Sequence, residues 1–160
     1  MEEIIIRSLS VEDQEWKEKM LREYWGSTKI VRKGELLELI DNPGFVASLN
    51  QQPAGLCTYQ LTDNQLEITS LVSWIQGKGV GAALLNAVLS QAKDAKVKRI
   101  WLITTNDNMS GLRFYQKNGF RLVALYPNAL EKARLLKPEI PLTGLENIPM
   151  RDELELEIFL

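Results

Sequence analysis

The sequence predicts a mixed α/β fold in a single domain over residues 1–160, and three observations support this prediction. An apolar strand at 66–73 leads through a glycine-rich turn into an amphipathic helix from about Gly79 to Ala95. The apolar stretches 45–49, 54–62 and 65–73 are joined by short polar connections, which is typical of an antiparallel meander. Because the helix separates strand 66–73 from the next apolar stretch, 99–104, these two strands are expected to run parallel.

Local signals place the other elements around this centre. A β-branched strand is expected at 3–8, and Ser10-Val-Glu-Asp13 resembles a capping box that starts a helix reaching about Trp25. Further helices are expected at 34–40, from Asn108, and at 128–137, and further strands at 99–104 and 120–125. The stretch 138–152 predicts a long irregular loop. Glutamates alternate with apolar residues over 153–159, which predicts a strand with its acids toward solvent, at an edge open to another copy.

Composition narrows the function classes. A net charge of -2 and a pI near 5.3 predict no general attraction to nucleic acid or to an anionic membrane. No run reaches the length of a membrane-spanning helix, and the acidic start Met1-Glu2-Glu3 is unlike a secretory signal, so a cytoplasmic protein is expected. The single cysteine, Cys57, excludes an internal disulfide and is expected to be a buried thiol. The absence of histidine removes histidine-dependent triads and nearly every histidine-based zinc site, and no metal is expected.

The turn Gln76-Gly-Lys-Gly-Val-Gly81 predicts a phosphate site. Its glycines allow a close backbone approach, and the helix that follows offers free N–H groups at the positive end of its dipole. A P-loop is excluded because Lys78 is followed by Gly79 and not by a hydroxyl residue. A dinucleotide fingerprint fits Gly77, Gly79 and Ala82, but strand 99–104 ends without an acidic residue to hold a ribose. A plain packing turn is the structural alternative.

A third pattern, Gln/Arg-x-x-Gly-x-Gly/Ala, fits Gln76, Gly79 and Gly81 in full. Further along, Asn108-Met-Ser-Gly-Leu-Arg-Phe-Tyr115-Gln-Lys-Asn-Gly119-Phe120 predicts a helix with a glycine at its C-terminal cap. In these two segments the sequence resembles the GNAT superfamily of acetyl-CoA-dependent N-acyltransferases. The resemblance covers about residues 44–125. It implies a mostly antiparallel twisted sheet with a splayed parallel pair, acetyl-CoA as co-substrate, and direct transfer of the acetyl group to a primary amine.

The same resemblance assigns roles to residues. Those implied to bind the cofactor are Leu71, Val72, Ser73, Gln76, Gly77, Lys78, Gly79, Val80, Gly81, Ala82, Asn108 and Tyr115. The Leu71 N–H is the implied oxyanion donor, although the segment up to Gln76 lacks the usual proline and is a residue short, which leaves the donor open by about one position. Tyr115 would protonate the departing thiolate, because a phenol with a pKa of about 10 is a feasible acid for a thiolate whose parent thiol is near 8.5.

A carboxylate is the natural base in a chain without histidine. Counted by twos along its strand, Glu67 shares a face with Thr69, Leu71 and Ser73 and is the first choice. Asp152, Glu153 and the later glutamates are rivals, and an acceptor of low pKa would need no base. Structural alternatives stay open: a core tyrosine at 115, a helix-capping Asn108 and a surface Glu67.

The acceptor itself is not identified by the sequence. A small-molecule or peptide amine fits the resemblance, and a homodimer is expected because dimers are common in the superfamily. The alternative function is a non-catalytic acyl-CoA-binding or regulatory module of the same fold.

Overall fold

A computed structural model describes residues 2–160, and these residues form two compact units. The first unit comprises residues 2–14, 41–100 and 159–160, and the second comprises 15–40 and 101–158. Each unit is therefore built from stretches that are far apart in the sequence. That residues 1–160 act as one domain stays a prediction.

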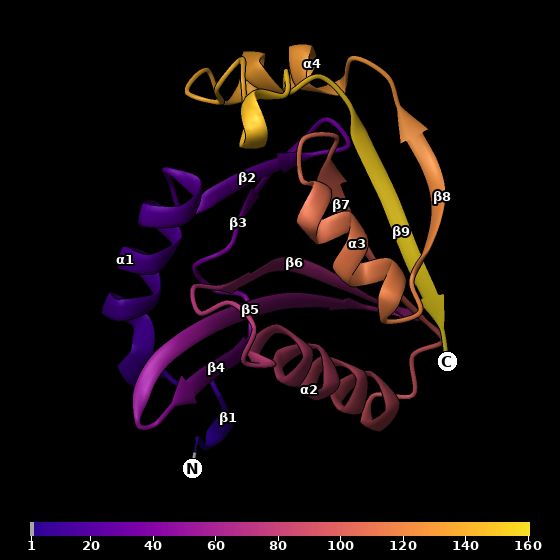
Figure 1. The fold of residues 1–160 in the computed structure, drawn as a ribbon. Helices are drawn as coiled ribbons and strands as arrows, with labels where there is room; N and C mark the ends of the chain where they lie inside the picture. Colours follow the sequence, from indigo (N-terminus) through magenta and orange to yellow (C-terminus); the bar gives the residue numbers. More distant parts are fainter. Residues whose placement is uncertain (1) are drawn as a thin grey trace. The chain divides into compact units, whose positions relative to one another are not determined.

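The first unit is an antiparallel sheet with one long helix on it. The strands β1 (Ile4–Ser8), β4 (Gly44–Leu49), β5 (Gln52–Thr62) and β6 (Gln65–Ser73) follow one another in this order. Helix α2 (Val80–Asp94) lies along these strands and contacts all four (Figure 1). Its buried side chains are the predicted apolar stripe of Val80, Leu84, Leu85, Val88 and Ala92.

Close packing of α2 on the sheet depends on Gly55 in β5. A Cβ atom at this position would lie 2.9 Å from the Leu84 Cδ1 atom and 2.9 Å from the Val80 Cγ1 atom. Strand β7 (Arg99–Thr105), whose first two residues belong to the first unit, stands next to β6 in the strand order. Because α2 joins them as a crossover helix, β6 and β7 run parallel, as predicted.

The second unit combines three helices, a hairpin and the remaining strands. Its elements are α1 (Gln14–Trp25), β2 (Lys29–Arg32), β3 (Glu35–Glu38), most of β7, α3 (Met109–Lys117), β8 (Arg121–Tyr126), α4 (Ala129–Leu136) and β9 (Glu153–Phe159). A short 3-10 turn, Val11–Asp13, precedes α1, and another, Leu145–Asn147, lies in the loop before β9. In this unit β9 stands between β7 and β8 and pairs with β8 in the antiparallel sense (Figure 1).

Three sequence-based expectations are wrong here. Residues 34–40 do not form a helix, because β2 and β3 form a hairpin whose turn holds Lys33 at φ 51° and Gly34 at φ 76°. Strand β9 is not an edge strand, since it has a neighbour on each side. Its acids do not all face solvent either, because Glu153 and Glu155 are only 2% and 6% exposed.

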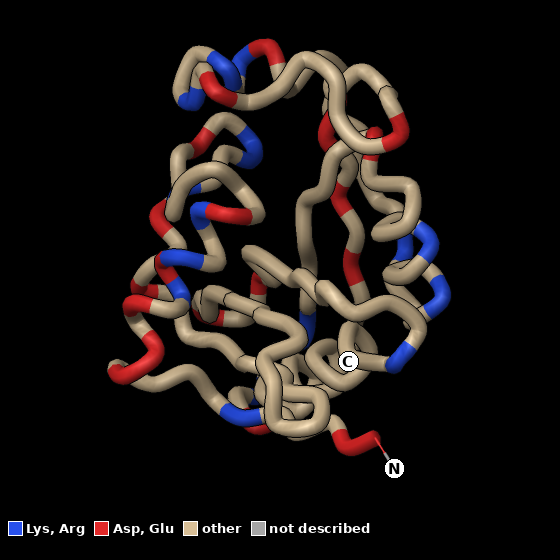
Figure 2. Tube along the Cα trace, turned by 60° about the vertical axis from the view of Figure 1, so that its left-hand side comes forward, with Lys and Arg blue, Asp and Glu red and all other residues tan. Residues whose placement is uncertain are grey.

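The predicted fold class is confirmed. Among residues 2–160, seven strands belong to the main sheet, two strands form a separate hairpin, and four α-helices accompany them. Basic and acidic residues are interspersed along the described trace rather than gathered into one run (Figure 2). None of the helices in residues 2–160 is both long enough and apolar enough to cross a membrane.

Candidate active site

The turn between β6 and α2 has the backbone that its glycines predict. Gly77 and Gly79 have φ values of 75° and 83°, in the left-handed region that residues with a side chain rarely adopt. A Cβ atom at Gly77 would meet nothing within 4 Å, and one at Gly79 would meet only the Ile4 Cδ1 atom at 3.9 Å. The two glycines are therefore needed for the left-handed backbone of the turn, and their surface is open. Both facts argue against a turn selected only for packing.

The start of α2 has the electrostatics of an anion site. The Ala83 N–H donates to the Gly79 carbonyl at 3.0 Å, so the earlier N–H groups of Val80, Gly81 and Ala82 have no acceptor within the helix. The first turn of α2 contains no acidic residue. Lys78 adds a positive charge beside this end of the helix, where its ammonium pairs with Glu2 at 3.0 Å. The helix dipole and Lys78 both favour a negatively charged ligand.

Local hydrogen bonds fix the path from the strand into the turn. The Ser73 hydroxyl donates to the Ile75 carbonyl at 2.9 Å, and the Gln76 amide donates back to the Ser73 carbonyl at 3.4 Å. The Trp74 indole N–H donates to the Pro53 carbonyl at 2.8 Å. The end of β6, Leu71–Ser73, pairs with Cys57–Gly55 on β5. Strand end, turn and helix start thus form one continuous and well-anchored segment.

A β-bulge in β6 changes the face on which Glu67 lies. Ser70 pairs with Thr58, but Ile68 pairs with Tyr59, so Thr69 is an extra residue on β6. Glu67 pairs with Gln60, which shares its face with Thr58. Glu67 therefore lies on the face of Ser70, and the expectation that it shares a face with Leu71 and Ser73 is wrong. Glu67 is also buried, at 5% exposure, and is not a surface residue.

A chain of hydroxyl groups, which the sequence analysis did not single out, crosses the same bulge. Thr58 Oγ1 lies 2.6 Å from Ser70 Oγ and 2.8 Å from Thr69 Oγ1, and Thr69 donates to Asn42 Oδ1 at 2.8 Å. Each hydroxyl has one proton, so the donors run from Ser70 to Thr58 to Thr69 to Asn42. All four side chains are buried. A cluster of hydroxyl residues in an otherwise apolar strand pair was the signal available in the sequence.

Helix α3 carries Asn108 and Tyr115. Asn108 caps the helix, because its Oδ1 atom accepts the Gly111 N–H at 3.1 Å while its Nδ2 atom donates to Thr104 Oγ1 at 3.0 Å. The Tyr115 ring is 7% exposed and makes edge contacts with the rings of Phe114 and Phe120, at centroid distances of 5.2 and 5.5 Å. These contacts fix the orientation of the tyrosine ring.

The helix ends as its sequence predicts. Gly119 has φ 93°, its N–H donates to the Gln116 carbonyl, and the Phe120 N–H donates to the Tyr115 carbonyl at 3.0 Å. This pair of bonds is a Schellman motif.

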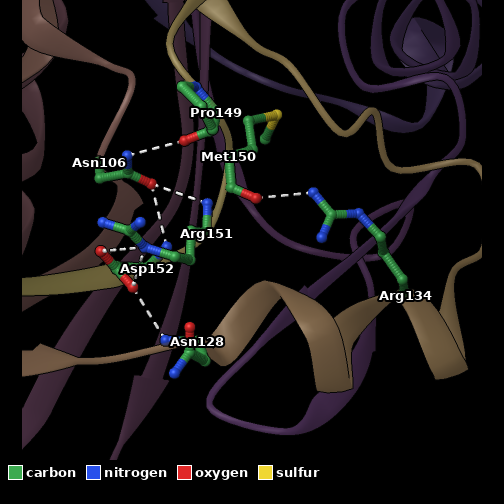
Figure 3. A network of polar contacts seen from close by, with 7 residues as sticks. All are labelled: Asn106, Asn128, Arg134, Pro149, Met150, Arg151 and Asp152. Carbon is green, nitrogen blue, oxygen red and sulfur yellow. Dashed lines mark hydrogen bonds and ion pairs between the residues drawn. The ribbon is translucent and has the colours of Figure 1, made fainter.

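The second unit also holds the rival carboxylates, of which Asp152 and Glu153 are engaged in structural contacts. Asp152 Oδ1 accepts the Asn128 N–H at 2.8 Å, at the start of α4 (Figure 3). Glu153 accepts the backbone N–H of Lys33 at 2.9 Å. Burial raises the pKa of Glu153 above its ordinary value.

The predicted loop 138–152 is tied down by side chains from neighbouring elements (Figure 3). Asn106 Oδ1 accepts the backbone N–H groups of Arg151 and Asp152 at 2.9 and 3.0 Å, and its amide donates to the Pro149 carbonyl. The Arg134 guanidinium donates to the carbonyls of Ile140, Pro141 and Met150. Within residues 2–160, no group of three or more cysteine, aspartate and glutamate side chains is placed to hold a metal ion.

The comparison with family descriptions decides the family. Residues 5–120 match the acetyltransferase (GNAT) family. The chain belongs to this family. This GNAT protein has relatives in Bacillus subtilis (strain 168). One of them, "Uncharacterized protein YxbD", is 43% identical to it over 136 residues, which is 84% of this chain and 86% of that protein. "Uncharacterized N-acetyltransferase Rv2669" of Mycobacterium tuberculosis is 37% identical over 60 residues, 38% of each chain.

Solved structures of GNAT proteins share the fold at low identity. An IAA acetyltransferase from Bacillus cereus has a TM-score of 0.75 at 21% identity and covers 99% of this chain and 100% of that one. A GNAT family acetyltransferase from Elizabethkingia anophelis with acetyl-CoA bound has a TM-score of 0.70 at 20% identity, with 98% of each chain covered. The Escherichia coli ribosomal-protein-S18-alanine N-acetyltransferase has a TM-score of 0.69 at 14% identity, with 98% and 94% covered.

Proposed function

We propose that this GNAT protein transfers an acetyl group from acetyl-CoA to a primary amine of a small molecule or a peptide. The observation that carries the proposal is the open glycine turn at the start of α2, where backbone N–H groups and Lys78 favour an anion. The acetyl-CoA in the Elizabethkingia anophelis structure supports the choice of co-substrate. A cytoplasmic location and a homodimer remain predictions that accompany the proposal.

The residues of the first unit fit such a co-substrate. The segment Gln76–Ala82 would hold the pyrophosphate, because its glycines leave room for a close approach and its N–H groups lie ahead of the first helical bond. The backbone of Leu71, Val72 and Ser73 would pair with the pantetheine arm, and the Leu71 N–H would stabilise the oxyanion. Acetyl-CoA would supply the activated thioester. In the second unit, Asn108 would add a polar contact through the amide that also caps α3.

Two ionisable side chains would handle the protons. Glu67 would accept the proton that the amine loses as its nitrogen bonds to the carbonyl carbon, and its position on a buried, hydroxyl-lined strand face supports this role. Tyr115 would give a proton to the sulfur as the carbon–sulfur bond breaks, and its fixed ring supports that role. Both assignments concern single residues and can be tested separately.

Calorimetric titration of acetyl-CoA tests the phosphate site. Gly79→Glu places a carboxylate in the turn and should abolish binding through charge repulsion and steric exclusion. Gly26→Glu is the matched control, because Gly26 also has a left-handed φ, of 74°, and open space around its Cβ position. Equal loss of acetyl-CoA affinity in the two variants would overturn the assignment of the phosphate site.

Thiol release across a panel of amines tests the chemistry. Tyr115→Phe should leave acetyl-CoA affinity nearly unchanged and lower kcat by roughly 10²- to 10⁴-fold. Glu67→Gln should lower kcat most at low pH, because there the largest fraction of the acceptor amine is protonated and needs a base to remove its proton. Tight binding of acetyl-CoA without turnover on any amine would favour the regulatory module. No binding of acetyl-CoA at all would refute both the acetyltransferase function and the regulatory module.

A further inference from the structure

The tip of the β2–β3 hairpin places a lysine ammonium among aromatic rings and carboxylates of the second unit. Lys33 Nζ lies 3.1 Å from Glu155 Oε1 on β9. It also lies 5.4 Å from the ring centroid of Trp101 on β7 and 5.4 Å from that of Tyr126 on β8. A carboxylate combined with two ring faces is the chemistry that recognises an alkylammonium group.

The surroundings of this ammonium are built into the strands. Tyr126 donates its hydroxyl to the same Glu155 oxygen at 2.7 Å, which fixes the carboxylate. Glu153 lies two residues earlier on the same face of β9 and accepts the backbone N–H of Lys33 at 2.9 Å. We name Trp101, Tyr126, Glu153 and Glu155 the ammonium box.

The carboxylates of the ammonium box outnumber the ammonium inside it. Glu155 and Glu153 are both buried, while the Lys33 side chain retains 38% of its exposure. Arg32 adds a second positive charge nearby, but its guanidinium lies over the Trp101 ring, 5.3 Å from the centroid. Once Lys33 leaves, two carboxylates face one guanidinium, so the ammonium box has the charge to hold a cation, and it can be reached from solvent along the Lys33 stem.

Lys33 is not the residue that the hairpin turn prefers. It occupies a left-handed position before Gly34, which is typical of a type I′ turn, where asparagine before glycine is favoured. Its link to Glu153 uses only the backbone N–H, so the hairpin keeps that anchor with any side chain at this position. The side chain thus contributes mainly an ammonium for the box.

We propose that the ammonium box recognises one alkylammonium group of the acceptor, that Lys33 occupies it until the acceptor binds, and that the acceptor is a diamine or polyamine. A diamine offers one ammonium group to the box and has a second amine that can accept an acetyl group. This inference rests on the proposed function for the transfer step, but the binding step stands without it.

Binding of 1,4-diaminobutane in the absence of acetyl-CoA tests the ammonium box, by calorimetry and by Trp fluorescence at constant ionic strength. Lys33→Asn removes the resident ammonium and gives the turn its preferred Asn-Gly sequence, so this variant should bind the diamine at least about tenfold more tightly than the unchanged protein. Lys29→Asn, on the same hairpin, is the matched control and should leave the affinity unchanged. Glu155→Gln in the Lys33→Asn background should remove the gain.

Two outcomes would overturn the proposal. One is equal diamine affinity in the Lys33→Asn and unchanged proteins, and the other is a gain that survives Glu155→Gln. In turnover assays, Glu155→Gln should raise the KM for 1,4-diaminobutane with little change in the KM for butylamine. Diamine binding without acetyl-CoA binding would refute the transfer function alone, whereas turnover of other amines without diamine binding would refute the ammonium box alone.

Discussion

Thr58 and Ser70 place their hydroxyl oxygens 2.6 Å apart across the β6 bulge, in a chain that ends at Asn42. Thr58→Val preserves the side-chain shape but leaves the Ser70 donor and the Thr69 acceptor without this partner. Because Thr58 is fully buried, the variant should lose about 1–3 kcal/mol of unfolding free energy, measured in urea. Thr62→Val, at an exposed position of the same strand, should change it by less than about 0.5 kcal/mol. A Thr58→Val variant as stable as the control would contradict the chain of donors.

Arg134 should hold the loop 138–152 in place. Its Nη2 atom donates to the Pro141 and Met150 carbonyls at 2.7 Å each, and its Nε atom donates to the Ile140 carbonyl at 3.2 Å. The single nitrogen of a lysine ammonium cannot reproduce this fork from two nitrogens. Arg134→Lys should therefore raise amide hydrogen exchange across the loop while leaving exchange in α2 unchanged. Arg113→Lys, at an exposed position on α3, serves as the control. Equal exchange in the two variants would show that the guanidinium fork does not hold the loop.

Acid should weaken the protein partly through Asp13. The Arg7 guanidinium donates to both Asp13 oxygens at 2.8 Å, and this holds the pKa of Asp13 well below its usual range. In the unfolded state the aspartate has a pKa of about 3.9, so the folded state binds fewer protons at that pH. The stabilisation is therefore present above this pH and is lost as the pH falls below it. Asp13→Asn should flatten the fall in Tm between about pH 5 and pH 2, and Glu23→Gln should not.

Cys57 should be inert in the folded protein. Its side chain is fully buried, and burial raises the pKa of the thiol. A thiol reagent such as Ellman's reagent should react with it only as fast as the protein opens, and at once in strong denaturant. Fast stoichiometric labelling under native conditions would contradict the buried placement.

Elements with strong local signals were predicted well from the sequence. The α2 stripe follows from apolar spacing, and the end of α3 follows from Gly119, whose left-handed backbone closes the helix. The glycines of the turn before α2 were recognised for the same reason, because a left-handed backbone conformation depends on the residue itself and not on distant contacts. Cys57 was expected to be buried from its apolar strand, and it is.

The errors all come from strand pairing and packing that the residue pattern of a single segment does not show. Residues 34–40 have a helical composition, but pairing with β2 makes them a strand. One extra residue at Thr69 moves Glu67 to the other strand face, and counting by twos cannot reveal a bulge. The glutamates of β9 alternate as a solvated face would, yet the hairpin tip at Lys33 covers two of them.

The pairing of Lys33 with Glu155 also bears on how the chain folds. The two residues are 122 positions apart, and the stretch Asp41–Ile100 between them belongs to the first unit. Closing so long a loop costs entropy before any contact repays it, and such non-local contacts slow folding. We therefore expect the first unit, with its consecutive hairpins, to form early and the hairpin tip to settle onto β9 late, as a separate slow kinetic phase.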